Sequence, residues 1–201
     1  MAQAHSHSHS HDHGHHDQES LKQFGFWLFM ITDVILFATL FATFIVLRDN
    51  TASGPVGADL IEMNGIIIST FILLTSSFTS GLALLSMNKG DKRGLILWLA
   101  VSALLGLSFI YLEVNEFIHL VHEGAKISTS AYWSAFYTLV GTHGLHVSIG
   151  IVWMTAIIIQ LAKRGITPVT KRKVNIISLY WHFLDAVWIF VFSLVYLMEV
   201  M

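Results

Sequence analysis

Five long apolar runs, joined by short polar segments, limit what this chain can fold into. We place them at 24–47, 62–87, 95–121, 131–162 and 174–198. About 20 helical residues cross the roughly 30 Å of hydrocarbon in a bilayer, and each run is at least that long. The runs therefore predict an all-α integral membrane protein, a bundle of five transmembrane helices.

The composition agrees with a chain embedded in lipid. Only 12% of the residues are charged, 54% are apolar, and the mean hydropathy is +0.65. An average soluble domain has about 25% charged residues, and the loops here leave no room for a soluble catalytic domain. The absence of cysteine excludes disulfides, thiolate metal sites and cysteine nucleophiles. No signal peptide is expected, because the first run, from Phe24, lacks a cleavage signature.

Residues 1–22 differ from the rest of the chain in being polar and rich in histidine. Such a tract can bind metal loosely but cannot build a core, so we expect it to be disordered. The sequence thus predicts a His-rich tail, residues 1–22, and a five-helix transmembrane domain, residues 23–201. The histidines of the tail are His5, His7, His9, His11, His13, His15 and His16.

Lysine and arginine predict how the helices are oriented. Most basic residues fall on the side that carries the N-terminal tail, and only Arg48 and Lys126 fall on the other side. By the positive-inside rule the N-terminus is cytoplasmic and the C-terminus is periplasmic. The basic residues on the tail side are Lys22, Lys89, Lys92, Arg93, Lys163, Arg164, Lys171, Arg172 and Lys173.

Acids and histidines inside the predicted spans are the candidate functional residues. An ionised acid at a helix centre costs roughly 2.5–3.5 kcal/mol in a bilayer, so they should face the interior, a water-filled cleft or another subunit. Asp33, alone on its run, is expected to face a lipid cleft or another helix, with a proton-related role left open. Depths at about 1.5 Å per residue suggest two polar layers. We predict a buried polar network of Glu113, Glu116, His143, His146, His182 and Asp185.

Small residues accompany these groups along the helices. Ser69, Ser76 and Ser80 form one stripe on the second predicted helix. Gly106 shares a face with the acid Glu113 on the third, and Gly150 follows the histidines of the fourth. Because small side chains let helix backbones approach closely and let hydroxyls bond across, we expect helix contacts along these faces.

A metal or haem site is the less favoured interpretation of these residues. Glu116 and His119 form one Glu-x-x-His pair, whereas di-iron bundles need two such pairs and two further glutamates. A catalytic zinc needs three convergent ligands, and His146 and His182 differ by roughly 7 Å of helix rise, which disfavours haem. No Gly-x-Ser-x-Gly turn is present for a hydrolase. We expect no catalytic, cofactor-binding or metal-binding residue in this chain.

Four stretches resemble one known family. GTHGLHVSIGIVW (Gly141–Trp153) and YWHFLDAVWIFVFSLVYLM (Tyr180–Met198) look like the last two helices of subunit III of haem–copper respiratory oxidases. FIYLEVNEFIHL (Phe109–Leu120) resembles the Glu-bearing helix of that family, and GFWLFMITDVILFATLFATF (Gly25–Phe44) resembles its carboxylate-bearing helix. The five-helix form is similar to the bacterial type, and the opening and tail look most like the subunit of cytochrome bo-type ubiquinol oxidases.

The resemblance implies an accessory, non-catalytic subunit of a proton-pumping terminal quinol oxidase in a bacterial inner membrane. That complex oxidises quinol and reduces oxygen to water, and its haem and copper would belong to the partner catalytic subunit. This chain would carry no redox centre, stabilise the catalytic subunit, bind phospholipid and sustain proton uptake. The implied partners are oxidase subunits I, II and IV, with no nucleic acid. Many members carry Glu at Asp33, and the choice between ubiquinol and menaquinol stays open.

A transporter is the alternative function from another class. A metal-ion or proton-coupled transporter would use the inner carboxylates and histidines as a translocation path and the His-rich tail as a metal collector. An assembly factor outside any oxidase is a third candidate. A transporter should purify alone, whereas an oxidase subunit should co-purify with haem-containing partners.

Overall fold

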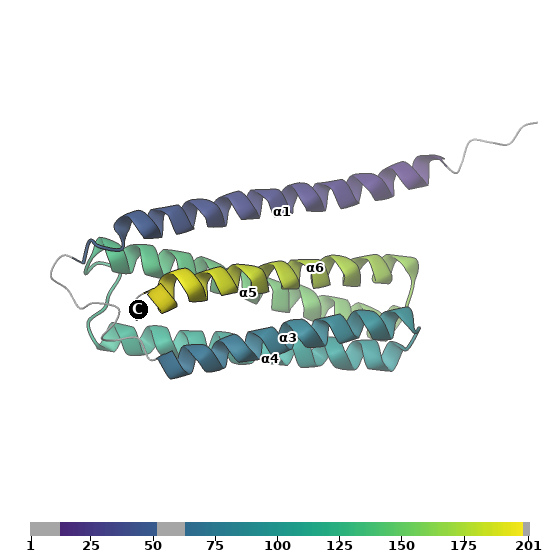
Figure 1. The fold of residues 1–201 in the computed structure, drawn as a ribbon. Coiled ribbons are helices and arrows are strands. Elements are labelled where there is room, and N and C mark those ends of the chain that lie inside the picture. Colours follow the sequence, from purple (N-terminus) through teal and green to yellow (C-terminus); the bar gives the residue numbers. More distant parts are fainter. Residues whose placement is uncertain (1–12, 52–62, 199–201) are drawn as a thin grey trace, which may run out of the picture. The chain divides into compact units, whose positions relative to one another are not determined.

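The computed structural model describes residues 13–51 and 63–198, and all of its regular structure there is helical. The helices are α1 (His13–Leu47), α3 (Met63–Asn88), α4 (Lys92–His122), α5 (Ala131–Arg164) and α6 (Pro168–Val191) (Figure 1). A π-helical segment, η1 (Phe192–Leu197), continues α6. Within the described ranges, five helices are long and apolar enough to cross a membrane. The predicted all-α architecture with five spans is confirmed.

The chain divides into two compact units, residues 1–36 and 37–201, with the boundary inside α1. The expected tail, residues 1–22, lies mostly outside the described residues, and α1 begins within it at His13. Its disorder and the domain boundary at residue 22 stay predictions.

Local capping explains where two of the helices begin. The Asp91 carboxylate accepts a hydrogen bond from the backbone N–H of Arg93 at 3.0 Å, so α4 begins at Lys92, three residues before the predicted span. Thr167 forms a reciprocal capping box with Thr170, and Pro168 occupies the first turn of α6. Both features are typical of helix starts. Because of them, α6 begins at Pro168, six residues before the predicted start at 174. The added residues include a basic segment that hydropathy alone assigns to a loop.

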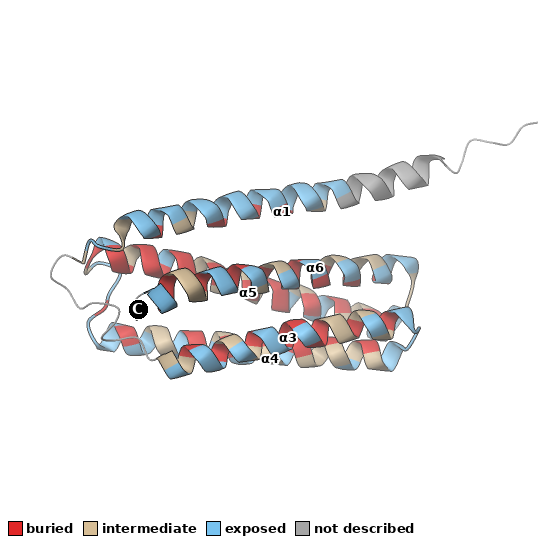
Figure 2. Ribbon diagram, in the orientation of Figure 1, coloured by how far each residue is buried: buried red, intermediate tan, exposed pale blue. Residues whose placement is uncertain are grey.

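In the second unit, α3, α4, α5 and α6 form a four-helix ring. Helix α3 packs against α4 and α6, and α5 packs against the same two helices from the other side. Figure 2 shows buried residues on the sides of these helices that face one another. The part of α1 in this unit contributes Phe37 and Phe44, both almost fully buried. The Phe44 ring lies 5.8 Å from that of Tyr132, and the Phe37 ring lies 5.2 Å from the His146 ring, measured between centroids.

The indole of Trp181 joins all four helices of this ring. Its Nε1–H donates a hydrogen bond to Ser76 Oγ on α3 at 2.9 Å, and Ser76 donates onward to the Ser102 carbonyl of α4 at 2.9 Å. A Cβ built on Gly106 of α4 would lie 2.8 Å from this indole, and one built on Gly150 of α5 would lie 2.9 Å from it. The small residues therefore mark helix contacts, as the sequence predicted, and they make room for one large side chain of α6.

A second indole repeats this arrangement two turns further along α6. Trp188 Nε1–H donates to Thr70 Oγ1 of α3 at 3.0 Å. Its ring packs edge-on against Phe109 of α4 at 4.7 Å and stacks on His143 of α5 at 5.2 Å between centroids. Two tryptophans seven residues apart share a helix face, so α6 is fixed to α3 at two depths.

Replacing Gly150 with alanine should destabilise the bundle, because the added methyl group would overlap Trp181. Overpacking of this kind costs about 1–3 kcal/mol. Gly141→Ala on the same helix is the control, since no atom of the described residues lies within 4 Å of a Cβ at that position. Thermal unfolding in detergent should show a lower midpoint for Gly150→Ala alone. Equal midpoints for the two variants would contradict the close approach at Gly150.

Candidate functional site

The six residues of the predicted polar network occupy three separate places in the second unit. Glu113 and Glu116 lie between α3 and α4. His143 and His146 lie on α5 and both approach Phe37 of α1. The remaining two, on α6, lie beside α3.

The first place is a cavity of about 290 Å³ between α3 and α4. The Glu113 side chain is buried, and the Ser69 hydroxyl lies beside it. The adjacent turns of α4 bring Glu116, Asn115 and His119 to the same cavity. The cavity is thus lined by polar side chains together with the apolar residues Ile66 and Leu112.

The second place is aromatic rather than hydrogen-bonded. His143 is fully buried, and neither of its ring nitrogens has a hydrogen-bond partner among the described residues. Its ring stacks on Trp188 and meets Phe109 edge-on at 6.0 Å between centroids. His146 bonds locally instead, with Nδ1 2.8 Å from the Thr142 carbonyl oxygen of its own helix. Its backbone carbonyl accepts a hydrogen bond from the Tyr180 hydroxyl at 3.2 Å.

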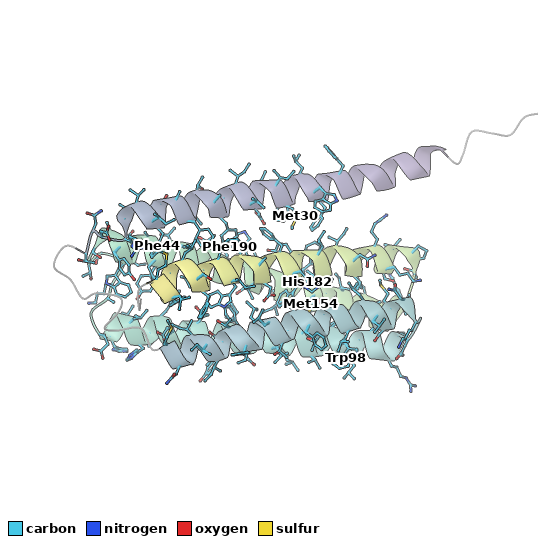
Figure 3. The ribbon with its side chains drawn as sticks, viewed as in Figure 1. Met30, Phe44, Trp98, Met154, His182 and Phe190 are labelled. Carbon is cyan, nitrogen blue, oxygen red and sulfur yellow. The ribbon has the colours of Figure 1, made fainter. Side chains whose placement is uncertain are left out.

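The third place joins α6 to α3. The imidazole of His182 (labelled in Figure 3) has its Nδ1 2.7 Å from Ser77 Oγ. Asp185 lies one turn further along α6, close to both Ser77 and His182. His182 is exposed on the surface of this chain, whereas Ser77 is buried. This imidazole therefore holds one helix contact while presenting part of its ring to whatever surrounds the bundle.

Asp33 belongs to the first unit and lies near the middle of the span Phe24–Leu47. Its side chain is buried and shares a face of α1 with Met30, three residues earlier. Its expected neighbour, a lipid cleft or another helix, stays a prediction.

The polar network itself also stays a prediction, and the structure adds residues that the sequence argument left out. These are Thr70 and Ser77 of α3 and the two tryptophans of α6. The spacing of seven residues between Trp181 and Trp188 places both on one face of α6, and this spacing could have identified them as a helix contact. The sequence argument considered the acids and histidines inside the spans instead. In the described parts of the chain, no three His, Asp or Glu side chains are grouped so as to hold a metal ion.

Comparison with known proteins assigns the chain to a family. The model of the family described as cytochrome c oxidase subunit III matches residues 4–200. The chain belongs to the cytochrome c oxidase subunit III family. The resemblance of its four stretches to subunit III of haem–copper oxidases is therefore confirmed. With its five helical spans, it is a multi-pass protein of the bacterial inner membrane.

Relatives in this family carry names from two kinds of oxidase. The chain is 55% identical to the quinol oxidase subunit 3 of Bacillus subtilis (strain 168), over 89% of this chain and 87% of that protein. It is 51% identical to the cytochrome bo(3) ubiquinol oxidase subunit 3 of Pseudomonas aeruginosa, over 91% and 88% of the two chains. It is also 47% identical to a cytochrome c oxidase subunit 3 of Bacillus subtilis (strain 168), over 88% and 86%. These relatives are subunits of oxidoreductases.

In this subunit III chain, Ser77→Ala should weaken the contact between α3 and α6. The hydrogen bond to His182 would be lost, and such bonds in membrane helix pairs average about 0.6 kcal/mol with a maximum near 1.7. A double-mutant cycle with His182→Phe should return a coupling energy of about that size. Thr75→Ala is the control, because among the described residues its hydroxyl bonds to the Phe71 carbonyl of its own helix and to no other helix. Additive effects at Ser77 and His182 would contradict the contact.

Proposed function

We propose that this chain is the accessory subunit III of a terminal oxidase that oxidises quinol and reduces oxygen to water. The observation that carries the proposal is its similarity to relatives named for quinol. Two Bacillus proteins named quinol oxidase subunit 3 are 55% and 54% identical to it, and one named for ubiquinol is 51% identical. A relative named cytochrome c oxidase subunit 3, from Bacillus sp. (strain PS3), is 48% identical.

The role proposed for the chain is to stabilise the catalytic subunit, which would hold the haem and copper. In the most apolar windows of the four spans in the second unit, only 33% to 50% of the residues are buried within the chain. The remaining surface is available to lipid and to partner subunits, for which we propose subunits I, II and IV and bound phospholipid. This chain would carry no redox centre, and the complex as a whole would act as the oxidoreductase and proton pump.

The proposed orientation places the N-terminus in the cytoplasm and the C-terminus on the periplasmic side. The basic residues support it, because residues 89–93 and 163–173 carry eight of the eleven, while Arg48 and Lys126 stand alone at the opposite ends. Asp33 is proposed to face a lipid cleft or another helix near the midplane. Asp33→Asn should leave assembly intact if its charge alone matters, and loss of assembly would argue for a structural role.

Deletion of the gene tests the substrate assignment. Membranes that lack this chain should lose much of their quinol-driven oxygen consumption while oxygen consumption driven by reduced cytochrome c is unchanged. The haem and copper content per catalytic subunit should stay the same, because the proposal places neither in this chain. If the cytochrome c-driven rate were lost instead, the chain would belong to a cytochrome c oxidase and the quinol assignment would be wrong. Loss of haem or copper from the catalytic subunit would contradict an accessory role.

A further inference from the structure

One polar side chain of the second unit is exposed halfway along its membrane span. His182 lies fourteen residues after Pro168 and fifteen before Leu197, the two ends of the span. At about 1.5 Å per residue, it is roughly 21 Å from either end. Its hydrogen-bond partner Ser77 lies at a similar depth, fourteen residues after Met63 at the start of α3. The exposed part of the imidazole therefore lies in the hydrocarbon region, away from the headgroups.

Only one edge of this imidazole is satisfied within the chain. Its Nδ1 lies 2.7 Å from Ser77 Oγ, and its Nε2 has no hydrogen-bond partner among the described residues. The contact with Ser77, with Asp185 beside both groups, holds Nε2 on the side of the ring away from α3. Acyl chains of lipids offer no hydrogen-bonding group. Lipid alone would therefore leave Nε2 unsatisfied, whereas polar side chains inside membrane spans almost always pair with another polar group.

The surroundings of His182 suit the approach of another helix. Ala186 and Ile189, four and seven residues further along α6, share its face and are exposed. On α3, Gly81 lies one turn from Ser77, and no atom of the described residues lies within 4 Å of a Cβ built on it. Small residues let a neighbouring helix come close. The face thus combines apolar side chains, space for a backbone and one central polar group.

The part of α1 in the second unit covers a different face of α6. The Phe37 ring lies 6.4 Å from that of Phe183, and the Phe41 ring lies 6.3 Å from that of Phe190, measured between centroids. Phe183 follows His182 directly in the sequence, so it lies about 100° around the helix from it. This part of α1 therefore leaves the face of His182 open.

We propose that a transmembrane helix of a partner oxidase subunit docks on this face and hydrogen-bonds to His182 Nε2 through a hydroxyl or amide side chain. The inference rests on the proposed function, which places the chain in a multi-subunit oxidase. Hydroxyl and amide groups both donate and accept hydrogen bonds, so they match either neutral form of the imidazole. An acid, a lysine or an arginine would bring a further charge into the middle of the bilayer, which is costly.

The test separates the two ring nitrogens in the intact oxidase, purified through its catalytic subunit. An asparagine amide reaches about as far as Nδ1, and a glutamine amide reaches about as far as Nε2. His182→Asn should therefore keep the contact with Ser77 and lose the partner, so that this chain leaves the complex about threefold to tenfold faster in detergent. His182→Gln should leave at close to the native rate. His122→Asn, at an exposed position at the end of α4, is the matched control and should not change the rate.

A photo-crosslinker identifies the occupant of the face. Benzoylphenylalanine at Ile189, seven residues from His182, should capture a transmembrane segment of a partner subunit that carries a hydroxyl or amide side chain within about two turns of the captured position. Capture of lipid or quinone alone, or of a segment without such a side chain, would overturn the proposal.

The dissociation rates give a second, independent way for the proposal to fail. Equal rates for His182→Asn and His122→Asn, or for His182→Asn and His182→Gln, would overturn it. If His182→Asn fails to fold, the crosslink decides. A chain that never co-purifies with a haem protein would instead overturn the proposed function.

Discussion

Replacing Trp181 with alanine is expected to lower the free energy of unfolding by about 3–5 kcal/mol, the range for a buried tryptophan. This indole is 1% exposed, fills the space left by Gly106 and Gly150, and hydrogen-bonds to Ser76. Removing it opens a cavity at a point where α3, α4, α5 and α6 meet. A loss of this size is a large fraction of the 5–15 kcal/mol typical of a whole domain, so most of the chain should fail to accumulate in the membrane.

The control for this variant is Trp98→Ala on α4. Trp98 is only partly buried (labelled in Figure 3), and the bond from the Ser102 hydroxyl goes to its backbone carbonyl, which the substitution keeps. The midpoints of thermal unfolding of Trp181→Ala and Trp98→Ala are compared for the purified chain in detergent, with size-exclusion chromatography as the readout of the folded fraction. Trp181→Phe should fall between alanine and the native residue. Equal midpoints for Trp181→Ala and Trp98→Ala would contradict a central role for this indole.

Changing His143 should give opposite results for two substitutions. The imidazole is fully buried between Trp188, Phe109 and Phe37, and no described residue hydrogen-bonds to its nitrogens. His143→Phe keeps the ring packing and removes two polar atoms, so stability should stay within about 1 kcal/mol of native or rise. His143→Lys places an ammonium in an apolar site, which costs several kcal/mol.

The same pair of substitutions at His122, exposed at the end of α4, is the control and should change stability little. Expression level and thermal midpoint are the measurements for all four variants. If His143→Phe proves as damaging as His143→Lys, the imidazole has an essential polar partner, and the account of it as an aromatic packing residue is wrong.

The number and type of helices could be predicted from the sequence because lipid leaves few options. Each span needs about 20 apolar residues, and the five runs met that length. The ends of the spans were less predictable. Helix α6 begins at Pro168 because Thr167 caps it, whereas the basic residues that follow had suggested a loop. Hydropathy reports burial in lipid, and capping follows separate, local rules.

The arrangement of the candidate site could be predicted only within single helices. The spacing of His182 and Asp185 correctly placed them on one face, and the structure brings both close to Ser77. Which helices face one another depends on contacts between residues far apart in the sequence. In the structure these contacts place Glu113 between α3 and α4 and His143 among aromatic rings, in two separate places. The tryptophans were overlooked because an apolar ring inside a span is unremarkable by composition. Their importance comes from Gly106, Gly150, Ser76 and Thr70, on helices distant in sequence.

The most direct test of the whole account is to purify this chain through an affinity tag from the membranes of its own bacterium and record an optical spectrum. We expect reduced-minus-oxidised haem bands in constant proportion to the tagged chain, together with quinol-driven oxygen consumption. A folded chain that elutes alone, without haem and with zinc bound after removal of the His-rich tail, would contradict the account and favour a transporter.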